Sequence, residues 1–374
     1  MPALLLYFRD IRSMMMDLLW VYICLGDACD TFFDACWYRI RRLAVLDFSD
    51  IRLFVLDLDG TFYLGDRIFD FSLDFLRTLE ETGREYMFFT NNSSRSPMDY
   101  VKRLNGMGCR ITRRHIMTSG DIMIEYLRRY YPEKTVYLLG TPALEESFRQ
   151  EGIRLFNTGA ACGYRPDIEI GADAAINPDL DSRSDAVKKS AAGIMQAADK
   201  KCDVINKPAR PDIVVVGFDK TLTYEKLVCA CRYIREGAEY LATHPDVNCP
   251  VPGGFDPDCG AMCALISLST GRQPIVLGKP AAETVEMIVA KTGFKPWQIA
   301  FVGDRLYTDV AAGVRNGSRG LLVLSGEATM ADVEASDVKP DGIYADLGDI
   351  GREVRRAWQG KIRNERSEEP RQRH

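Results

Sequence analysis

Histidine is scarce in this sequence, and its scarcity argues against several classes of active site. Only His115, His244 and His374 occur among 374 residues. A Ser-His-Asp hydrolase needs a histidine base, and zinc sites commonly use this residue as a ligand. The 11 cysteines include no CxxC pair that could supply the missing zinc ligands. Neither chemistry is therefore favoured.

The cysteines form no pattern typical of a disulfide framework. Their number is odd and they are scattered along the chain. Free thiols in a reducing compartment explain this usage best, so we expect a cytoplasmic protein. Cys259 and Cys263 share one face of an expected helix, where buried, unreactive thiols are favoured.

Long uncharged hydrophobic runs are also missing. The apolar stretch near the start is interrupted by Asp17, Asp27, Asp30 and Asp34, and no basic segment precedes it. It is too short for a membrane span and lacks the form of a signal peptide. We expect no membrane partner, and residues 1–48 are left as an N-terminal extension of unknown role.

No run of lysine and arginine indicates a nucleic-acid surface. The chain carries 48 basic and 53 acidic residues, a formal charge of −5. The basic residues near the end alternate with glutamate, which favours a solvated or frayed tail over residues 358–374. We expect no nucleic-acid partner.

Strands and helices alternate from residue 51 onward. The run "IRLFVLDL" is short and continuously apolar, as expected for a strand buried on both faces of a parallel sheet. The segment "SLDFLRTLEETG" has helical spacing and ends in Gly83. Repetition of this pattern predicts an α/β fold with a Rossmann-like, doubly wound parallel sheet.

A long middle region interrupts this sheet and is expected to form an inserted α/β cap domain. Residues 171–211 within it are polar and alanine-rich and are typical of an insertion or linker. The expected order is core residues 49–130, cap residues 131–271, core residues 272–357, and then the tail.

Four polar segments each follow a predicted strand of the core sheet. Ligands bind at the carboxyl ends of strands in open parallel sheets, so these segments are expected to meet. They are Asp57-Leu58-Asp59-Gly60-Thr61, Thr90-Asn91-Asn92, Gly278-Lys279-Pro280, and Gly303-Asp304 with Asp309.

The residue types suit phosphoryl transfer. A carboxylate can attack phosphorus and form an aspartyl-phosphate, and Asp57 at the strand end is the candidate nucleophile. Its repulsion from an anionic phosphate calls for Mg²⁺, which prefers oxygen ligands. Asp57, Asp304 and the backbone carbonyl of Asp59 could supply them. The Asp59 side chain could protonate the leaving oxygen and later deprotonate water.

The remaining residues could bind the phosphate group. The Thr90 hydroxyl and the Asn91 backbone N–H could hold phosphate oxygens, with Asn92 beside them. Lys279 could bridge the nucleophile and the phosphate as a point charge. Asp309 could orient Lys279 or a metal-bound water.

This ordered set resembles the haloacid dehalogenase (HAD) superfamily of phosphohydrolases. "DLDGTFYLGD", "FTNNS", "GKP" and "VGDRLYTD" are similar to its four motifs. The large insert between the second and third motifs resembles the class IIA branch, which includes nitrophenyl, pyridoxal phosphate, phosphoglycolate and sugar phosphatases. The resemblance covers roughly residues 50–350. It implies a Mg²⁺-dependent enzyme with Asp57 as nucleophile and Asp59 as acid and base.

The expected substrate is a phosphate monoester of a small metabolite. A phosphomutase or phosphotransferase on the same core is the alternative, followed by a non-catalytic binding protein of this fold. Segment 243–263 is the expected specificity region, since the core recognises only phosphate. The sequence does not determine the oligomeric state, and a homodimer formed through the cap is one of the alternatives.

Overall fold

The computed structural model describes residues 47–156, 210–251 and 253–368. The elements that bear on the site belong to one compact unit, Ile51–Arg355. The extension at residues 1–46 and nearly all of the expected insertion lie outside the described residues.

The first sheet confirms the predicted α/β core. Its six strands are all parallel. Their apolar runs are buried because helices cover a parallel sheet. In spatial order they are β15 (Gly342–Tyr344), β14 (Arg319–Val323), β13 (Ile299–Gly303), β1 (Leu53–Leu56), β4 (Glu85–Thr90) and β5 (Ile116–Thr118).

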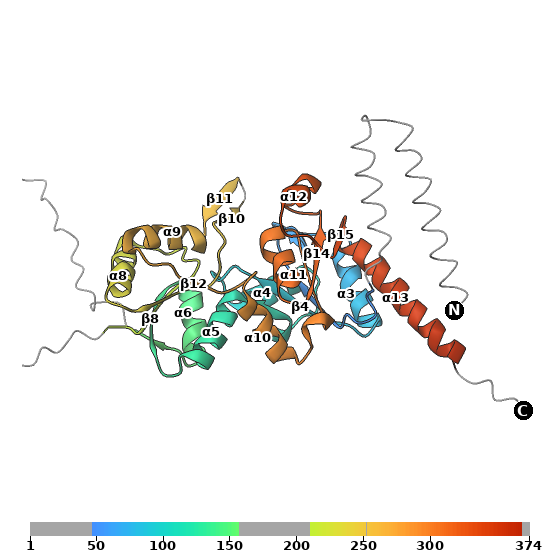
Figure 1. Ribbon diagram of the computed structural model, residues 1–374, viewed down its shortest axis with the longest axis horizontal. Coiled ribbons are helices and arrows are strands. Elements are labelled where there is room, and N and C mark those ends of the chain that lie inside the picture. Colours follow the sequence, from blue (N-terminus) through green and yellow to red (C-terminus); the bar gives the residue numbers. More distant parts are fainter. Residues whose placement is uncertain (1–46, 157–209, 252, 369–374) are drawn as a thin grey trace, which may run out of the picture. The chain divides into compact units, whose positions relative to one another are not determined.

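The strand order reverses at β1. The chain first adds β4 and β5 on one side of β1, and later adds β13, β14 and β15 on the other side. Figure 1 shows the two contributions as the blue-to-green and the orange-to-red ends of the chain. Such a switch point leaves a crevice at the carboxyl ends of the central strands, where ligands bind.

Local sequence signals mark the ends of several helices around this sheet. Ser96 caps α4 with a reciprocal capping box, and Gly293 ends α10 at a φ of 76°. The helices are α3 (Ser72–Glu81), α4 (Pro97–Gly106), α5 (Ser119–Tyr130), α10 (Ala282–Thr292), α11 (Ala311–Arg315), α12 (Met330–Ala335) and α13 (Leu347–Glu368). Short 3₁₀ turns span Arg113–His115 and Pro296–Gln298, a π-helical turn spans Leu306–Val310, and a small hairpin joins β2 (Tyr63–Leu64) to β3 (Arg67–Ile68).

A second parallel sheet forms the cap. Its spatial order is β12 (Ile275–Val276), β9 (Glu239–Ala242), β8 (Ile213–Val216), β6 (Thr135–Leu139) and β7 (Arg154–Leu155). It is accompanied by α6 (Pro142–Gln150), α8 (Tyr224–Arg235), α9 (Cys259–Thr270) and the antiparallel hairpin β10 (Asn248–Val251) and β11 (Gly254–Pro257).

The structure corrects one expected strand of the core. The segment "PIVLGKP" was predicted to add a strand to the first sheet, but β12 pairs in parallel with β9 of the second sheet. Only two of its residues form ladder pairs, with Leu241 and Ala242. An apolar run of this length shows that a strand forms but does not specify its partner sheet.

Two smaller expectations also change. Helix α13 continues to Glu368, so much of the expected tail is helical, and its Arg, Lys, Gln and Glu residues are good helix formers. Cys109, Cys231, Cys249, Cys259 and Cys263 are free thiols as expected, whereas Cys229 is disulfide-bonded, so the expectation of free thiols is wrong there. Among the described residues, no helix has both the length and the apolar character needed to cross a membrane.

The packing of α11 on β14 gives a test of the core. A Cβ added at Gly313 would lie 2.3 Å from the Arg319 carbonyl oxygen, whereas one added at Gly106 would meet no atom within 4 Å. We expect Gly313→Ala to lower the free energy of unfolding by about 1–3 kcal/mol, because the backbone of β14 must move. The matched helical substitution Gly106→Ala should be neutral or stabilising by up to about 1 kcal/mol. Urea unfolding measures both, and equal effects would contradict the packing described.

Candidate active site

Three adjacent strands of the first sheet bring acidic and amide groups to one place. Strand β1 lies between β13 and β4. Asp57 follows β1, Asp304 follows β13, and Asn91 follows β4. Because all three strands are parallel, their carboxyl ends meet at the switch point. These three segments therefore lie next to one another, as the sequence predicts.

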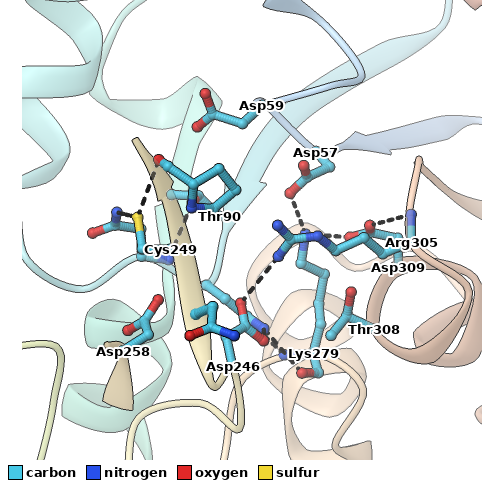
Figure 2. Close-up of a pocket in the computed structure, with 14 residues that line it drawn as sticks. Asp57, Asp59, Thr90, Asp246, Cys249, Asp258, Lys279, Arg305, Thr308 and Asp309 are labelled. Carbon is cyan, nitrogen blue, oxygen red and sulfur yellow. Dashed lines mark hydrogen bonds and ion pairs between the residues drawn. The ribbon is translucent and has the colours of Figure 1, made fainter. Parts of the chain in front are cut away.

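Lys279 occupies the centre of this arrangement. Its Nζ donates to Asp57 Oδ1 at 2.6 Å, to Asp309 Oδ1 at 2.5 Å and to the Phe89 carbonyl at 3.0 Å. Nζ also lies 5.2 Å from the centre of the Phe89 ring. Figure 2 shows the lysine reaching up between the two aspartates. All three N–H donors of the Lys279 ammonium are thus engaged in hydrogen bonds within the protein.

Lys279 reaches the core by a route that the sequence did not predict. It follows β12 of the second sheet, so the strand-end rule does not place it. Instead, Asn91 clamps its backbone: Lys279 N donates to Asn91 Oδ1 at 2.9 Å, and Asn91 Nδ2 donates to the Lys279 carbonyl at 3.0 Å. The Asn91 side chain, for which no separate role was predicted from the sequence, therefore positions the lysine.

The buried charges change each other's protonation. Burial lowers the pKa of the Lys279 ammonium, but Asp309 and Asp57 raise it by more, so its net pKa is above the ordinary value. Burial raises the pKa of the Asp57 carboxyl. The Lys279 charge lowers this pKa, and the Asp309 and Asp304 charges raise it further. The lysine stays charged, and the carboxylates around it repel one another.

Asp304 has one oxygen without a partner. Its Oδ2 accepts from the Glu327 backbone N–H at 2.7 Å, whereas the buried Oδ1 makes no hydrogen bond to any described residue. A Cβ at Gly60 or Gly326 would lie 2.3 or 2.0 Å from Oδ2, so only glycine fits there. Burial, and then Asp309, raises the pKa of Asp304 to about 6. An orphaned buried carboxylate oxygen calls for a cation.

A cation fits beside this oxygen. Asp57, Asp304 and Asp309 each offer a carboxylate oxygen, and these oxygens lie within 4.8 Å of one another. However, Asp309 uses Oδ1 on Lys279 and Oδ2 on the Arg305 backbone N–H at 3.2 Å. This pairing suits the orienting role predicted for Asp309.

Asp59 stands apart from the acidic group. Its Oδ2 accepts from Tyr63 Oη at 3.3 Å, and the Arg103 guanidinium lies over the Tyr63 ring. Figure 2 shows its carboxylate directed away from Lys279, on the other side of Asp57. Partial desolvation raises the pKa of the Asp59 carboxyl, although the residue is still exposed to solvent.

Thr90 and Asn92 are tied to the loop that carries them. The Asn92 backbone N–H donates to Thr90 Oγ1 at 3.1 Å, and Asn92 Oδ1 accepts from the Ser94 backbone N–H at 2.9 Å. Both residues line the pocket together with Asp57, Asp59, Asn91, Lys279 and Asp309. Of the expected site residues, Asp304 lies behind this lining.

The cap supplies one side of the same pocket, from the segment expected to set specificity, around the β10–β11 hairpin. Its lining residues are Asp246, Asn248, Cys249, Pro250 and Asp258. Sequence reasoning singled out segment 243–263 but none of these side chains. It also missed Arg305, which follows the predicted metal ligand directly and contacts Glu327 Oε2 at 2.7 Å and Asp246 Oδ2 at 3.6 Å. A basic residue inside the acidic motif "GDRLYTD" was the available signal.

His244 is buried and hydrogen-bonded, which is typical of a structural residue. Nε2 lies 2.9 Å from Asp258 Oδ1, and Nδ1 lies 2.8 Å from Thr243 Oγ1. Although His244, Asp246 and Asp258 are close enough to hold a metal, both ring nitrogens already have partners. Cys259 is likewise fully buried.

Comparison with known proteins agrees with this fold. Residues 54–154 match the family model of haloacid dehalogenase-like hydrolases, and residues 276–350 match a model described as HAD-hydrolase-like. The structure is similar to a 4-nitrophenylphosphatase from Thermotoga maritima, with 38% identity, coverage of 82% of this chain and 98% of that chain, and a TM-score of 0.66.

Two further relatives lie at lower identity. A double mutant of the thermostable NPPase from Geobacillus stearothermophilus is 26% identical, with 80% of this chain and 98% of that chain covered and a TM-score of 0.62. The "acid sugar phosphatase" of Staphylococcus epidermidis is 26% identical over 294 residues, which are 79% of this chain and 94% of the relative.

The chain therefore belongs to the haloacid dehalogenase-like hydrolases. Within them it falls in the class IIA group of nitrophenylphosphatases and acid sugar phosphatases, and it is an enzyme of the phosphatase class.

The Asn91 clamp generates a prediction. Asn91→Ala leaves the buried Lys279 backbone N–H without its acceptor, so we expect a loss of about 1–3 kcal/mol in the free energy of unfolding. Asn316 donates to the Pro280 carbonyl at 3.2 Å from a half-buried position and serves as the control. Thermal and urea unfolding of Asn91→Ala and Asn316→Ala should separate the two. A loss for Asn316→Ala as large as that for Asn91→Ala would show that the clamp has no special role.

Proposed function

We propose that this protein is a Mg²⁺-dependent phosphatase that hydrolyses a phosphate monoester of a small metabolite through an aspartyl-phosphate on Asp57. The observation that carries the proposal is the single Lys279 ammonium bound at once to Asp57 and Asp309, beside an unpartnered oxygen of Asp304. A binding protein does not require a nucleophile, a lysine and a cation site in contact.

Asp57 has one oxygen available for attack. Lys279 contacts Oδ1, and Oδ2 makes no hydrogen bond among the described residues. In the first step Asp57 Oδ2 forms a bond to phosphorus, and the bond from phosphorus to the alcohol oxygen breaks. Repulsion between the carboxylate and the phosphate is about 4 kcal/mol per charge pair at ~4 Å and an effective dielectric of ~20. Lys279 offsets part of this repulsion.

When bound, Mg²⁺ would offset the remaining repulsion between the Asp57 carboxylate and the phosphate. We propose Asp57, Asp304 and the Asp59 backbone carbonyl as its protein ligands, since Mg²⁺ takes few protein oxygens and keeps water and phosphate as the others. Asp304 Oδ1 would then gain the partner that none of the described residues provides. Asp309 holds Lys279 and the turn after Asp304 in place.

Asp59 is proposed as the general acid and base. Its raised pKa favours a carboxyl that can donate a proton. It protonates the departing alcohol oxygen, and the same carboxylate then takes a proton from the water that attacks phosphorus. The bond between Asp57 and phosphorus breaks, which releases inorganic phosphate and restores Asp57.

The Thr90 hydroxyl and the Asn91 backbone N–H are proposed to hold phosphate oxygens, with Asn92 beside them in the lining. The Asn91 side chain acts through Lys279 instead. The name of the staphylococcal relatives makes a sugar phosphate the first candidate substrate. We propose that residues 131–271, as the cap, choose the alcohol part.

Removal of the proposed nucleophile gives the first test. We expect Asp57→Asn to lose at least about a thousandfold in phosphate release from p-nitrophenyl phosphate, because an amide oxygen is a poor nucleophile. The fold should persist by circular dichroism. Wild-type release should need Mg²⁺ and stop with EDTA. Turnover of Asp57→Asn near the wild-type rate would exclude Asp57, and product isomerisation instead of release would favour a mutase.

The acid role of Asp59 gives a second test. Asp59→Asn cannot donate a proton, so turnover should fall most for alkyl phosphates, whose leaving alkoxides need protonation. The loss should be smaller for p-nitrophenyl phosphate, because nitrophenolate leaves unprotonated. Rates for both substrates in both proteins give the comparison. Equal losses for the two leaving groups would rule out the acid role.

A further inference from the structure

The cap places two carboxylates in the pocket, Asp246 before the β10–β11 hairpin and Asp258 after it. They differ in how many of their oxygens are free to bind a ligand. Asp246 has both oxygens engaged by the core. Oδ1 accepts from Asn91 Nδ2 at 3.1 Å, and Oδ2 lies 3.6 Å from Arg305 Nη1. Figure 2 shows the arginine reaching across to it. Asp246 of the cap is therefore held by Asn91 and Arg305 of the core, and its oxygens have little hydrogen-bonding capacity left for a ligand.

Asp258 is engaged on one oxygen only. Oδ1 accepts from the Cys259 backbone N–H, as the N-cap of α9, at 2.6 Å and contacts His244 Nε2 at 2.9 Å. Oδ2 has no hydrogen-bond partner among the described residues, although Asp258 is only 3% exposed and lines the pocket. A hydrogen-bond donor on a ligand in the pocket could therefore bind to Oδ2.

His244 fixes the orientation of the Asp258 carboxylate by contacting its Oδ1. Its ring is fully buried and is also held through Nδ1 by Thr243 of the cap and, at 3.3 Å, by Ser119 of the core. The imidazole contacts the same oxygen that caps the helix, so Oδ1 is fixed from two sides. Oδ2 is then the oxygen that faces the pocket.

The cations of the pocket are already committed. Among the described lining residues, only Lys279 and Arg305 are basic. Lys279 binds Asp57 and Asp309, and Arg305 binds Glu327 and Asp246. A second acidic group on the substrate would meet the Asp258 carboxylate with no free cation in this lining to receive it.

We propose that Asp258 is a specificity-determining residue that accepts a hydrogen bond from a hydroxyl of the alcohol part and rejects substrates whose alcohol part carries an acid. The substrate class is then the phosphate monoesters of neutral polyols. This inference rests on the proposed phosphatase function and adds the selection of the leaving group.

A pair of matched phosphate esters tests the proposal. Glycerol 3-phosphate and 3-phosphoglycerate have the same carbon skeleton. The first carries a hydroxymethyl group where the second carries a carboxylate. For the wild-type protein with Mg²⁺, kcat/KM should be at least about tenfold higher for glycerol 3-phosphate. In Asp258→Asn the lost repulsion should reduce that ratio at least about fivefold, mainly through a lower KM for 3-phosphoglycerate.

Two further variants control for folding and for general charge. Asp258→Ser keeps an N-cap oxygen for Cys259 without the charge and should show the same loss of discrimination. Asp256→Asn removes a nearby half-exposed carboxylate that pairs with Lys220 at 2.9 Å outside the pocket lining, and it should keep the wild-type ratio. Thermal unfolding checks that each variant is folded.

The outcomes separate this inference from the proposed function. Release of phosphate from p-nitrophenyl phosphate by the wild-type protein, with an unchanged substrate ratio in folded Asp258→Asn and Asp258→Ser, would overturn the role of Asp258 and leave the phosphatase intact. A wild-type preference for 3-phosphoglycerate would also overturn it. No Mg²⁺-dependent release from any of the three esters would instead count against the phosphatase and, with it, the inference.

Discussion

The structure of this site depends on one buried ammonium group. Lys279 is 2% exposed and bonds two carboxylates that follow different strands of the core sheet. Without that charge, Asp57 and Asp309 would be neighbouring anions in a poorly solvated place, and at least one would take up a proton. Removing one partner from such a group leaves an uncompensated buried charge. Lys279 thus opposes the protonation of Asp57, whose anionic form is the proposed nucleophile.

The same lysine links the two sheets. It follows β12 of the cap sheet, and Asn91 of the core holds its backbone by two hydrogen bonds. Asn91 also donates to Asp246 of the cap, which pairs with Arg305 of the core. The chemistry and the cap are therefore connected through Asn91. We infer that changes in the cap loop at Asp246 affect the position of Lys279.

Much of this could be predicted from the sequence, for physical reasons that apply to particular residues. The runs before Asp57, Thr90 and Asp304 are apolar because their strands are buried in a parallel sheet, and a parallel sheet brings strand ends together. Lys279 lies in the pocket, but the strand expected to bring it there belongs to the other sheet, because two apolar residues cannot specify which sheet they join. Asp246 and Asp258 were missed as pocket residues because their positions depend on how the cap loop meets the core, and no local pattern encodes that. Arg305 was missed although its place inside "GDRLYTD" was a local signal.

The central claim is that Asp57 carries the phosphoryl group, and chemical trapping tests it most directly. Borohydride reduces an aspartyl-phosphate to homoserine, so protein quenched during turnover and reduced should contain homoserine at position 57 when digested and analysed by mass spectrometry. The account predicts this conversion only when Mg²⁺ and a phosphate ester are both present. Sustained turnover with unmodified Asp57, or with the modification at another residue, would contradict it.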